Sequence, residues 1–457
     1  MVKCNTLAII NLEQMFYMCC NANLICVRIE QMFELNLNKY YRFRYANTME
    51  PRTILHCDCN NFYASVEICK NPELKGKPIA VCGNAEKRHG IVLAKSYPAK
   101  DLGVKTGDVI WEAKKKCPNL IVLGADYKAY MKYSEAVFEI FTRFTDRVEP
   151  FGLDECWLDV TASIKLLGSG EVIADTLREI VNSELGLTIS VGVSFTKIFA
   201  KLGSDLKKPD ATTIITRKNF RTKIWNLDVG DLLMVGRRTK VTLNKCNIYT
   251  IGDLAKADLK FIKAKLGIVG IQLVQSANGI ENSEVHYYYE RPIPKSIGHG
   301  TTTPRDIKCI EELRSVVYSL SDQVAKRLRL NNFLAKGVSL SARTNELESK
   351  GRQAHFLEPT NSGKDIAKAA LDLFEREFDL TVPLRKVQVS AFALVLIEDD
   401  MQYSFFDEEI KAGRLLDTCI DSLNIRYGHN TVKRGIIMLN NDMADIFSDI
   451  DFTPFKR

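Results

Sequence analysis

Apolar and polar residues alternate in short blocks from residue 53 onward, and the blocks switch between the periodicities of strands and helices. Strands are predicted at 53–58, 78–82, 90–95, 153–160, 187–193 and 211–216, and helices at 62–70, 107–116, 127–146 and 171–185. Interleaving of this kind predicts an α/β domain in which helices cover a sheet.

The second half of the chain has a different pattern. Residues 217–282 form short helical blocks, two of which begin near Gly236 and Gly267. Glycine at a helix start can offer backbone N–H groups to a phosphate, as in helix-hairpin-helix units that hold a DNA backbone. Two ordinary helix boundaries explain the same pattern equally well. After a proline-containing linker at 283–294, the segment 295–397 follows a strand–helix–strand–strand–helix–strand order, which predicts a compact α+β unit.

Two apolar, strand-like stretches carry carboxylates without an evident partner: Asp58 ends the first, and adjacent Asp154 and Glu155 interrupt the second. Burying unpaired charge is costly, but distant carboxylates can share divalent cations, and Mg²⁺ takes oxygen ligands. Neighbouring strand residues point to opposite faces, so Asp154 and Glu155 can serve one site only at a strand end. Pro150 and Gly152 supply such a break. Phosphoryl or nucleotidyl transfer is therefore the first hypothesis.

Charge and cysteine content narrow the class of protein. The net charge is +7, but residues 398–457 carry 12 acidic and 7 basic residues, so the preceding body is strongly basic. A basic body favours a polyanionic partner such as nucleic acid. The 13 cysteines form no metal-binding or disulfide pattern, which predicts a reduced, cytoplasmic protein. No apolar run reaches the ~18–20 residues of a membrane helix. Residues 1–48 make a poor signal peptide and carry no functional prediction.

Six segments in order resemble the Y-family of translesion DNA polymerases, closest to bacterial DNA polymerase IV and UmuC-like proteins. They read LHCDCNNFYASVE (55–67), KGKPIAV (75–81), SYPAKDLGVKTG (96–107), PFGLDECWLDVT (150–161), SVGVSFTKIFAKLGSDLKKP (190–209) and KSIGHGT (295–301). The resemblance implies a multidomain right-hand polymerase of α/β and α+β domains. Its parts are an atypical extension (1–48), a palm (49–67 and 127–216), fingers (68–126), a helical thumb (217–282), a linker (283–294), a little finger (295–397) and an acidic tail (398–457).

The resemblance also assigns roles residue by residue. Two Mg²⁺ ions are expected on Asp58, Asp154 and Glu155, with Cys59 supplying only a backbone carbonyl. Tyr63, next to Phe62, matches the steric gate that excludes a ribose 2′-OH. The positions that match triphosphate contacts are Tyr97, Lys100 and Lys208.

This sequence departs from the family pattern at several positions. Lys100 stands where arginine is common, so a point charge replaces a bidentate fork. Ala94 replaces a frequent threonine, and Asn60 and Asn61 replace a more acidic or aromatic pair. Asp159 lies too far from the strand break to be a ligand and is expected to be structural. These changes leave nucleotide preference open, while the reaction class is unaffected.

Two further surfaces are expected to bind macromolecules. Candidate DNA contacts lie in the thumb and the little finger: Gly236, Arg237, Lys295, Ser296 and Arg343. The tail motif Gln402-Tyr403-Ser404-Phe405-Phe406 resembles the peptide by which bacterial polymerases dock on the sliding clamp, with Gln402, Ser404, Phe405 and Phe406 at the defining positions. Adjacent aromatics in an exposed segment suit a groove-binding peptide.

The resemblance implies a DNA-directed DNA polymerase that adds dNTPs to a primer 3′-OH with low fidelity in DNA damage tolerance. No second carboxylate cluster of the exonuclease kind occurs, so no proofreading is expected, and the protein is expected to be monomeric. Two alternatives stay open. One is a UmuC-like subunit that needs accessory proteins; the other is an inactive DNA- and clamp-binding module, against which the intact Asp58, Asp154, Glu155 and Lys208 argue.

Overall fold

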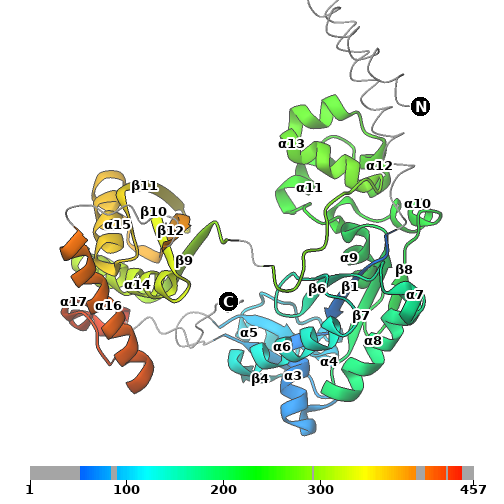
Figure 1. The fold of residues 1–457 in the computed structure, drawn as a ribbon, viewed down its shortest axis with the longest axis horizontal. Coiled ribbons are helices and arrows are strands. Elements are labelled where there is room, and N and C mark those ends of the chain that lie inside the picture. Colours follow the sequence, from blue (N-terminus) through cyan, green and yellow to red (C-terminus); the bar gives the residue numbers. More distant parts are fainter. Residues whose placement is uncertain (1–51, 84–89, 291–292, 398–406, 429–430, 445–457) are drawn as a thin grey trace, which may run out of the picture. The chain divides into compact units, whose positions relative to one another are not determined.

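The computed structural model describes residues 52–83, 90–290, 293–397, 407–428 and 431–444 (Figure 1). The predicted N-terminal extension and the clamp motif lie outside these ranges. Within them, no helix is both long and apolar enough to cross a membrane. The described part contains a five-stranded sheet, a three-stranded sheet, a helical segment and a four-stranded sheet.

The five-stranded sheet has the order β5-β6-β1-β7-β8 and places the first predicted strand at its centre. β1 pairs antiparallel with both β6 and β7, and β8 runs parallel to β7. The strands are β1 (Ile54–Cys59), β5 (Val148–Pro150), β6 (Glu155–Asp159), β7 (Ile189–Ser194) and β8 (Thr212–Ile214). The short β5 was not predicted.

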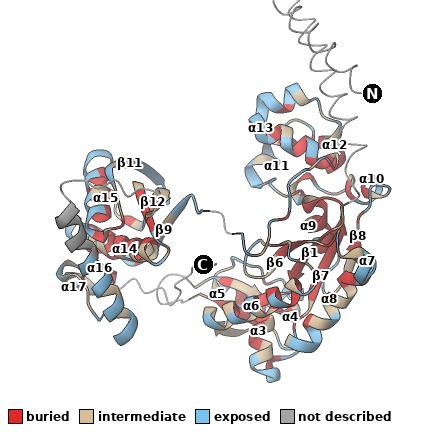
Figure 2. Cartoon of the chain, in the orientation of Figure 1, coloured by how far each residue is buried: buried red, intermediate tan, exposed pale blue. Residues whose placement is uncertain are grey.

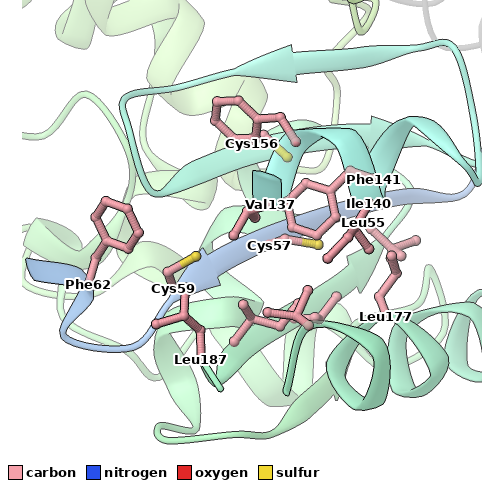
Figure 3. Packing of buried hydrophobic residues seen from close by; sticks show 14 of the residues in the cluster. Leu55, Cys57, Cys59, Phe62, Val137, Ile140, Phe141, Cys156, Leu177 and Leu187 are labelled. Carbon is pink, nitrogen blue, oxygen red and sulfur yellow. The ribbon is translucent and has the colours of Figure 1, made fainter. Parts of the chain in front are cut away.

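Alternation along β1 divides the sheet into two faces. Leu55, Cys57 and Cys59 point into the main hydrophobic core, where the side chains of three helices cover them (Figure 3). These helices are α3 (Phe62–Lys70), α6 (Tyr127–Thr142) and α8 (Gly170–Leu185).

The intervening β1 residues, His56 and Asp58, face α9 (Lys197–Leu206) on the other side. Gly192 allows α9 to lie directly on the sheet, because a Cβ there would come within 1.9 Å of the Ala200 carbonyl oxygen. Figure 2 shows both the strands and the inner surface of α9 as buried. The close approach brings polar groups of α9 onto the face that holds Asp58.

A three-stranded sheet with the order β3-β2-β4 lies in the segment predicted as fingers. It contains β2 (Ile79–Cys82), β3 (Val92–Lys95) and β4 (Ile121–Gly124), accompanied by α4 (Tyr97–Asp101) and α5 (Ile110–Lys116). Neither β4 nor α4 was predicted. β4 is only four residues long and pairs in parallel with β2, a contact between segments about 40 residues apart that local pattern does not reveal.

The predicted helical content of 217–282 is confirmed. The helices are α10 (Phe220–Ile224), α11 (Arg237–Asn244), α12 (Ile251–Lys256) and α13 (Leu259–Ala277). They share a hydrophobic core with Phe195, Phe199 and Leu202. Gly236 caps α11 as predicted, and Gly267, with φ of 63°, lies at a kink where two helices meet within α13, so a helix begins after it, also as predicted.

The predicted α+β order of 295–397 is also confirmed. Its sheet has the order β11-β10-β12-β9, with α14 and α15 packed on one face. The elements are β9 (Ser296–Ile307), α14 (Ile310–Leu330), β10 (Phe333–Thr344), β11 (Ser349–Thr360), α15 (Gly363–Glu377) and β12 (Leu384–Leu396).

Three helices of the acidic tail return to α14: α16 (Asp407–Tyr427), α17 (Gly435–Leu439) and α18 (Asn441–Ala444). Arg329 pairs with Asp421 at 2.7 Å, and the Ser319 hydroxyl donates to the Ala444 carbonyl at 2.7 Å. Part of the tail's negative charge thus neutralises arginines of this same unit.

Candidate active site

The predicted strand break brings the three acids to one end of the central sheet. β5 ends at Pro150, Gly152 takes φ of 127°, and β6 begins at Glu155. Glu155 then lies opposite Asp58 in the register of β1 and β6, and the Cys59 N–H donates to the Asp154 carbonyl at 2.9 Å. Asp154 precedes the strand, so it escapes the alternation that would separate it from Glu155.

Asp58 is buried and paired with a lysine that follows α9. Its Oδ2 lies 2.8 Å from Lys208 Nζ, which also contacts Asp205 at 3.0 Å. Burial raises the pKa of Asp58 to about 7, although the ammonium of Lys208 opposes the rise. Loss of solvent thus outweighs one ion pair at this position.

Glu155 lies in the opposite electrostatic environment. Its Oε2 accepts from Lys201 Nζ at 2.5 Å and lies 3.5 Å from His56 Nε2. Burial alone would raise its pKa, but the contacts with His56 and Lys201 outweigh burial and lower the pKa to about 2. Glu155 therefore stays ionised across the physiological range.

Asp154 forms no ion pair within the described ranges. Burial, followed by the charge of Glu155, raises its pKa to about 6. In the part of the chain that the structure describes, no three His, Cys, Asp or Glu side chains are gathered closely enough to hold a metal ion. The arrangement instead directs Asp58 and Glu155 to lysines and leaves Asp154 as the carboxylate without a cation.

Asp154→Asn is expected to stabilise the metal-free protein at pH 8 by about 1–2 kcal/mol. The pKa of Asp154 in the folded protein, about 6, exceeds that of an aspartate in the unfolded chain. The ionised Asp154 carboxylate therefore destabilises the folded protein increasingly as the pH rises from the unfolded-chain pKa to the folded-state pKa, and this effect is absent near pH 4. Urea denaturation in EDTA at both pH values measures it. Asp101→Asn, on the exposed end of α4, is the control. An equal stability of wild type and Asp154→Asn at pH 8 would contradict the burial effect.

Cys59 and Phe62 have their side chains in the hydrophobic core, as Figure 3 shows. They are each 3% exposed. The Cys59 thiol therefore faces away from the carboxylates, consistent with a role for its backbone alone. The ring of Phe62 packs against Tyr63 at 5.7 Å between centroids, so the side chain of Phe62 supports its neighbour from the core.

Tyr63 is held by other aromatic rings. It stacks on Tyr130 with 4.3 Å between ring centroids and an interplanar angle of 12°, and it meets Tyr127 edge-on at 5.8 Å. The Tyr130 hydroxyl donates to Glu67 at 2.8 Å, and this hydrogen bond fixes the Tyr130 ring on which Tyr63 stacks. Burial raises the pKa of Tyr63 to about 12, with smaller effects from Tyr127 and Asp154. Tyr63 is therefore a neutral, rigidly supported ring near Asp154.

The three candidate triphosphate contacts come from two elements. Tyr97 begins α4, and the ammonium of Lys100 lies 5.5 Å from its ring centroid. Burial raises the pKa of Tyr97, with opposing effects from the charges of Lys208 and Asp58, which places Tyr97 near both. The structure thus brings Tyr97 and Lys208 to the side of Asp58, with Lys100 beside the ring of Tyr97.

Asn60 has a role that the sequence did not reveal. It is 2% exposed, its amide nitrogen donates to Ser190 Oγ at 2.9 Å, and its amide oxygen accepts from the Asp210 N–H at 2.9 Å. It thereby ties β1 to the segment that carries Lys208. Asn60 was considered only as a departure from the family pattern.

The other predicted positions are on the surface. Gly236, Arg237, Lys295, Ser296 and Arg343 are all exposed. In the four-stranded sheet, Ser296 and Arg343 share the face opposite α14 and α15.

Asp159 accepts hydrogen bonds from the N–H and hydroxyl of Thr161, as expected for a structural acid.

Comparison with known proteins places this site in a family. The model of the impB/mucB/samB family matches residues 57–205, and the model of its C-terminal domain matches residues 294–404. The DNA polymerase IV of Acetivibrio thermocellus is 47% identical over 398 residues, which cover 86% of this chain and 100% of that protein. The chain belongs to the DNA polymerase IV family.

Other members of the DNA polymerase IV family are more distant in sequence. That of Moorella thermoacetica is 36% identical over 84% of this chain and 96% of its own length, and that of Clostridium acetobutylicum is 34% identical over 85% and 98%. A solved Y-family DNA polymerase chimera superposes with a TM-score of 0.67 at 22% identity, covering 75% of this chain and 99% of its own. The predicted polymerase fold and the prediction of a translesion DNA-directed DNA polymerase are thereby confirmed.

Proposed function

We propose that this polymerase adds dNTPs to a primer 3′-OH at the end of the central sheet, through Asp58, Asp154 and Glu155, and that it does so with low fidelity and without proofreading. The main support is the strand break at Gly152, which places both Asp154 and Glu155 beside Asp58. An uninterrupted strand would direct one of the two acids to the opposite face.

The donor set fits hard divalent cations, with two Mg²⁺ as the specific proposal. All three side chains offer carboxylate oxygens, and Asp154 is a largely desolvated acid without an ion-pair partner among the described residues. Such cations, when bound, would favour ionisation of the 3′-OH and neutralise the leaving pyrophosphate. The Cys59 carbonyl is proposed as a further ligand, since its thiol lies in the core.

The chain's own cations and aromatic groups would bind the nucleotide. Lys208, Lys100 and the Tyr97 hydroxyl are proposed to bind the triphosphate, because its charge needs donors beyond the metals. Lys208 already lies 2.8 Å from Asp58, so binding of the triphosphate would take this ammonium from the carboxylate. Tyr63 is proposed to face the sugar.

We propose that the sheets and the helical segment form the parts of a right hand. We assign the palm to 49–67 and 127–216, the fingers to 68–126, the thumb to 217–282, the linker to 283–294 and the little finger to 295–397. Primer–template DNA would then meet the α11 N-terminus at Gly236 and Arg237, and the exposed sheet face at Ser296 and Arg343, with Lys295 beside it. Backbone N–H groups and basic side chains there suit phosphates, not base edges.

Residues 402–406 are proposed to dock on a sliding clamp, in a monomeric, cytoplasmic enzyme. This motif lies outside the described residues, and its support is the sequence alone: two aromatics with Gln402 and Ser404. Docking of this kind raises the local concentration of primer ends without changing the chemistry.

The purified chain is expected to extend a primer with Mg²⁺ and dNTPs and without any other protein. This result would separate an autonomous polymerase from a UmuC-like subunit that needs accessory proteins. Extension is followed on an undamaged template and on templates with single lesions, with the alanine variant of Asp58 as the inactive control. Activity that appears only after cell extract is added would favour the dependent subunit.

A further inference from the structure

Charged side chains of α9 and of the central sheet form an unbroken series of alternating sign. Lys201 Nζ lies 2.5 Å from Glu155 and 3.9 Å from Asp205, and Lys208 Nζ lies 3.0 Å from Asp205 and 2.8 Å from Asp58. Lys208 is exposed and already has a proposed ligand, the triphosphate. Lys201, with 15% of its side chain exposed, has no role in the reaction described above.

Lys201 and His56 meet Glu155 at the same atom. Both Lys201 Nζ, at 2.5 Å, and His56 Nε2, at 3.5 Å, approach Oε2. Among the described residues, no hydrogen bond or ion pair reaches Oε1 of Glu155. One oxygen is thus occupied by the protein, and the other is left open.

His56 is itself fixed at its second nitrogen. Its ring is fully buried and lies edge-on to Trp157, with 5.3 Å between centroids, and its Nδ1 lies 2.8 Å from Ser204 Oγ. The Ser204 hydroxyl also lies 2.8 Å from the Lys201 carbonyl, so its single proton has two possible acceptors. In the Nε2–H tautomer this proton goes to Nδ1, and the Nε2–H group faces Oε2 of Glu155 at 3.5 Å, a charge–dipole contact longer than a hydrogen bond. Ser204 and Lys201 are one turn apart on α9, so a single helical turn supports both contacts.

We propose that Lys201 and His56 are positioning residues of the polymerase: they hold Oε2 of Glu155 so that Oε1 is directed at the bound cation. The inference rests on the proposed role of Glu155 as a metal ligand. A carboxylate at the start of a strand can otherwise rotate about its side-chain torsions, and partners of this kind fix the orientation of a ligand. Neither residue is proposed to touch the nucleotide or the DNA.

Lys201→Met is expected to lower kcat for nucleotide addition by about 10- to 100-fold and to weaken metal binding by about 10-fold. Mn²⁺ binding to the resting enzyme, measured by electron paramagnetic resonance without DNA or dNTP, gives a readout independent of turnover. Lys201→Arg keeps a cationic donor and is expected to recover part of both losses. Lys207→Met is the matched control, because it removes the same charge from an exposed lysine at the end of α9.

His56 variants distinguish positioning from simple packing. A glutamine amide reaches about as far as Nε2 and an asparagine amide about as far as Nδ1, so His56→Gln keeps the donor to Glu155, whereas His56→Asn keeps only the contact with Ser204. We expect His56→Gln to retain at least about 10-fold more activity and tighter Mn²⁺ binding than His56→Asn. Thermal melting of each variant monitors folding, and Lys201→Met and Lys201→Arg decide the matter if a His56 variant does not fold.

The inference and the proposed function fail in different ways. If Lys201→Met matches Lys207→Met in kcat and Mn²⁺ affinity, or if His56→Asn equals His56→Gln, the positioning role is overturned while Glu155 can still be a ligand. If Glu155→Ala itself retains synthesis and Mn²⁺ binding, the proposed function of Glu155 fails first.

Discussion

Replacing Asp154 and Glu155 together with alanine is expected to lower primer extension by about 10³-fold or more. Loss of metal ligands forfeits several kcal/mol of transition-state stabilisation, and ~4 kcal/mol corresponds to about 10³-fold in rate. Single-turnover addition of one dNTP to a labelled primer measures the effect. Binding of primer–template, followed by fluorescence anisotropy, is expected to stay within about threefold of wild type. The reason is that the proposed DNA contacts lie in the helical segment and the four-stranded sheet, away from the two substituted carboxylates.

Asp159→Asn is the matched control for the double variant. It removes a carboxylate from the same segment, yet an asparagine oxygen can still accept the hydrogen bond from the Thr161 N–H. The control should therefore keep near wild-type synthesis and stability. Substantial extension by the double variant would refute the assigned site, whereas equal loss in the double variant and in Asp159→Asn would indicate a folding defect in this segment.

The sequence predicted the site's carboxylates because their signal is local. Asp154 and Glu155 interrupt an apolar strand directly after Pro150 and Gly152, and the structure has the break at that point. The same local signal separated them from Asp159, which accepts hydrogen bonds from its own turn.

The groups around the carboxylates were not predictable in this way. Lys201 reaches Glu155 because α9 lies directly on the sheet, with Gly192 permitting the close approach. Asn60 reaches Asp210 because β7 pairs with both β1 and β8, and Asp210 leads into β8. The residues of these pairs are 46 and 150 positions apart in the sequence, so a local hydrophobic pattern cannot reveal the contacts. The short strand β4 was not predicted for the same reason: it pairs with β2, which is distant in the sequence. Sequence alone thus indicates the candidate ligands, and the fold supplies the residues that contact them.

Replacing Tyr63 with alanine is expected to raise the use of ribonucleotides relative to deoxyribonucleotides by about 10- to 100-fold. Steric exclusion of one small group is worth about 1–3 kcal/mol, which corresponds to this range. The ring can exclude a 2′-OH because it cannot move aside: it stacks on Tyr130 at 4.3 Å, and Tyr130 is fully buried and bonded to Glu67. The ratio of kcat/KM for rNTP and dNTP insertion opposite one template base measures the change.

Tyr63→Phe separates the ring from its hydroxyl. Phenylalanine keeps the stack on Tyr130, so discrimination should stay within about threefold of wild type if bulk is what excludes the ribose. Tyr63→Ala should also keep dNTP insertion within about tenfold, because the carboxylates do not depend on this ring. Relaxed discrimination in Tyr63→Phe would shift the role to a hydrogen bond from the hydroxyl, and unchanged discrimination in Tyr63→Ala would remove Tyr63 from the sugar site, leaving its stack with Tyr130 and Tyr127 as part of the core.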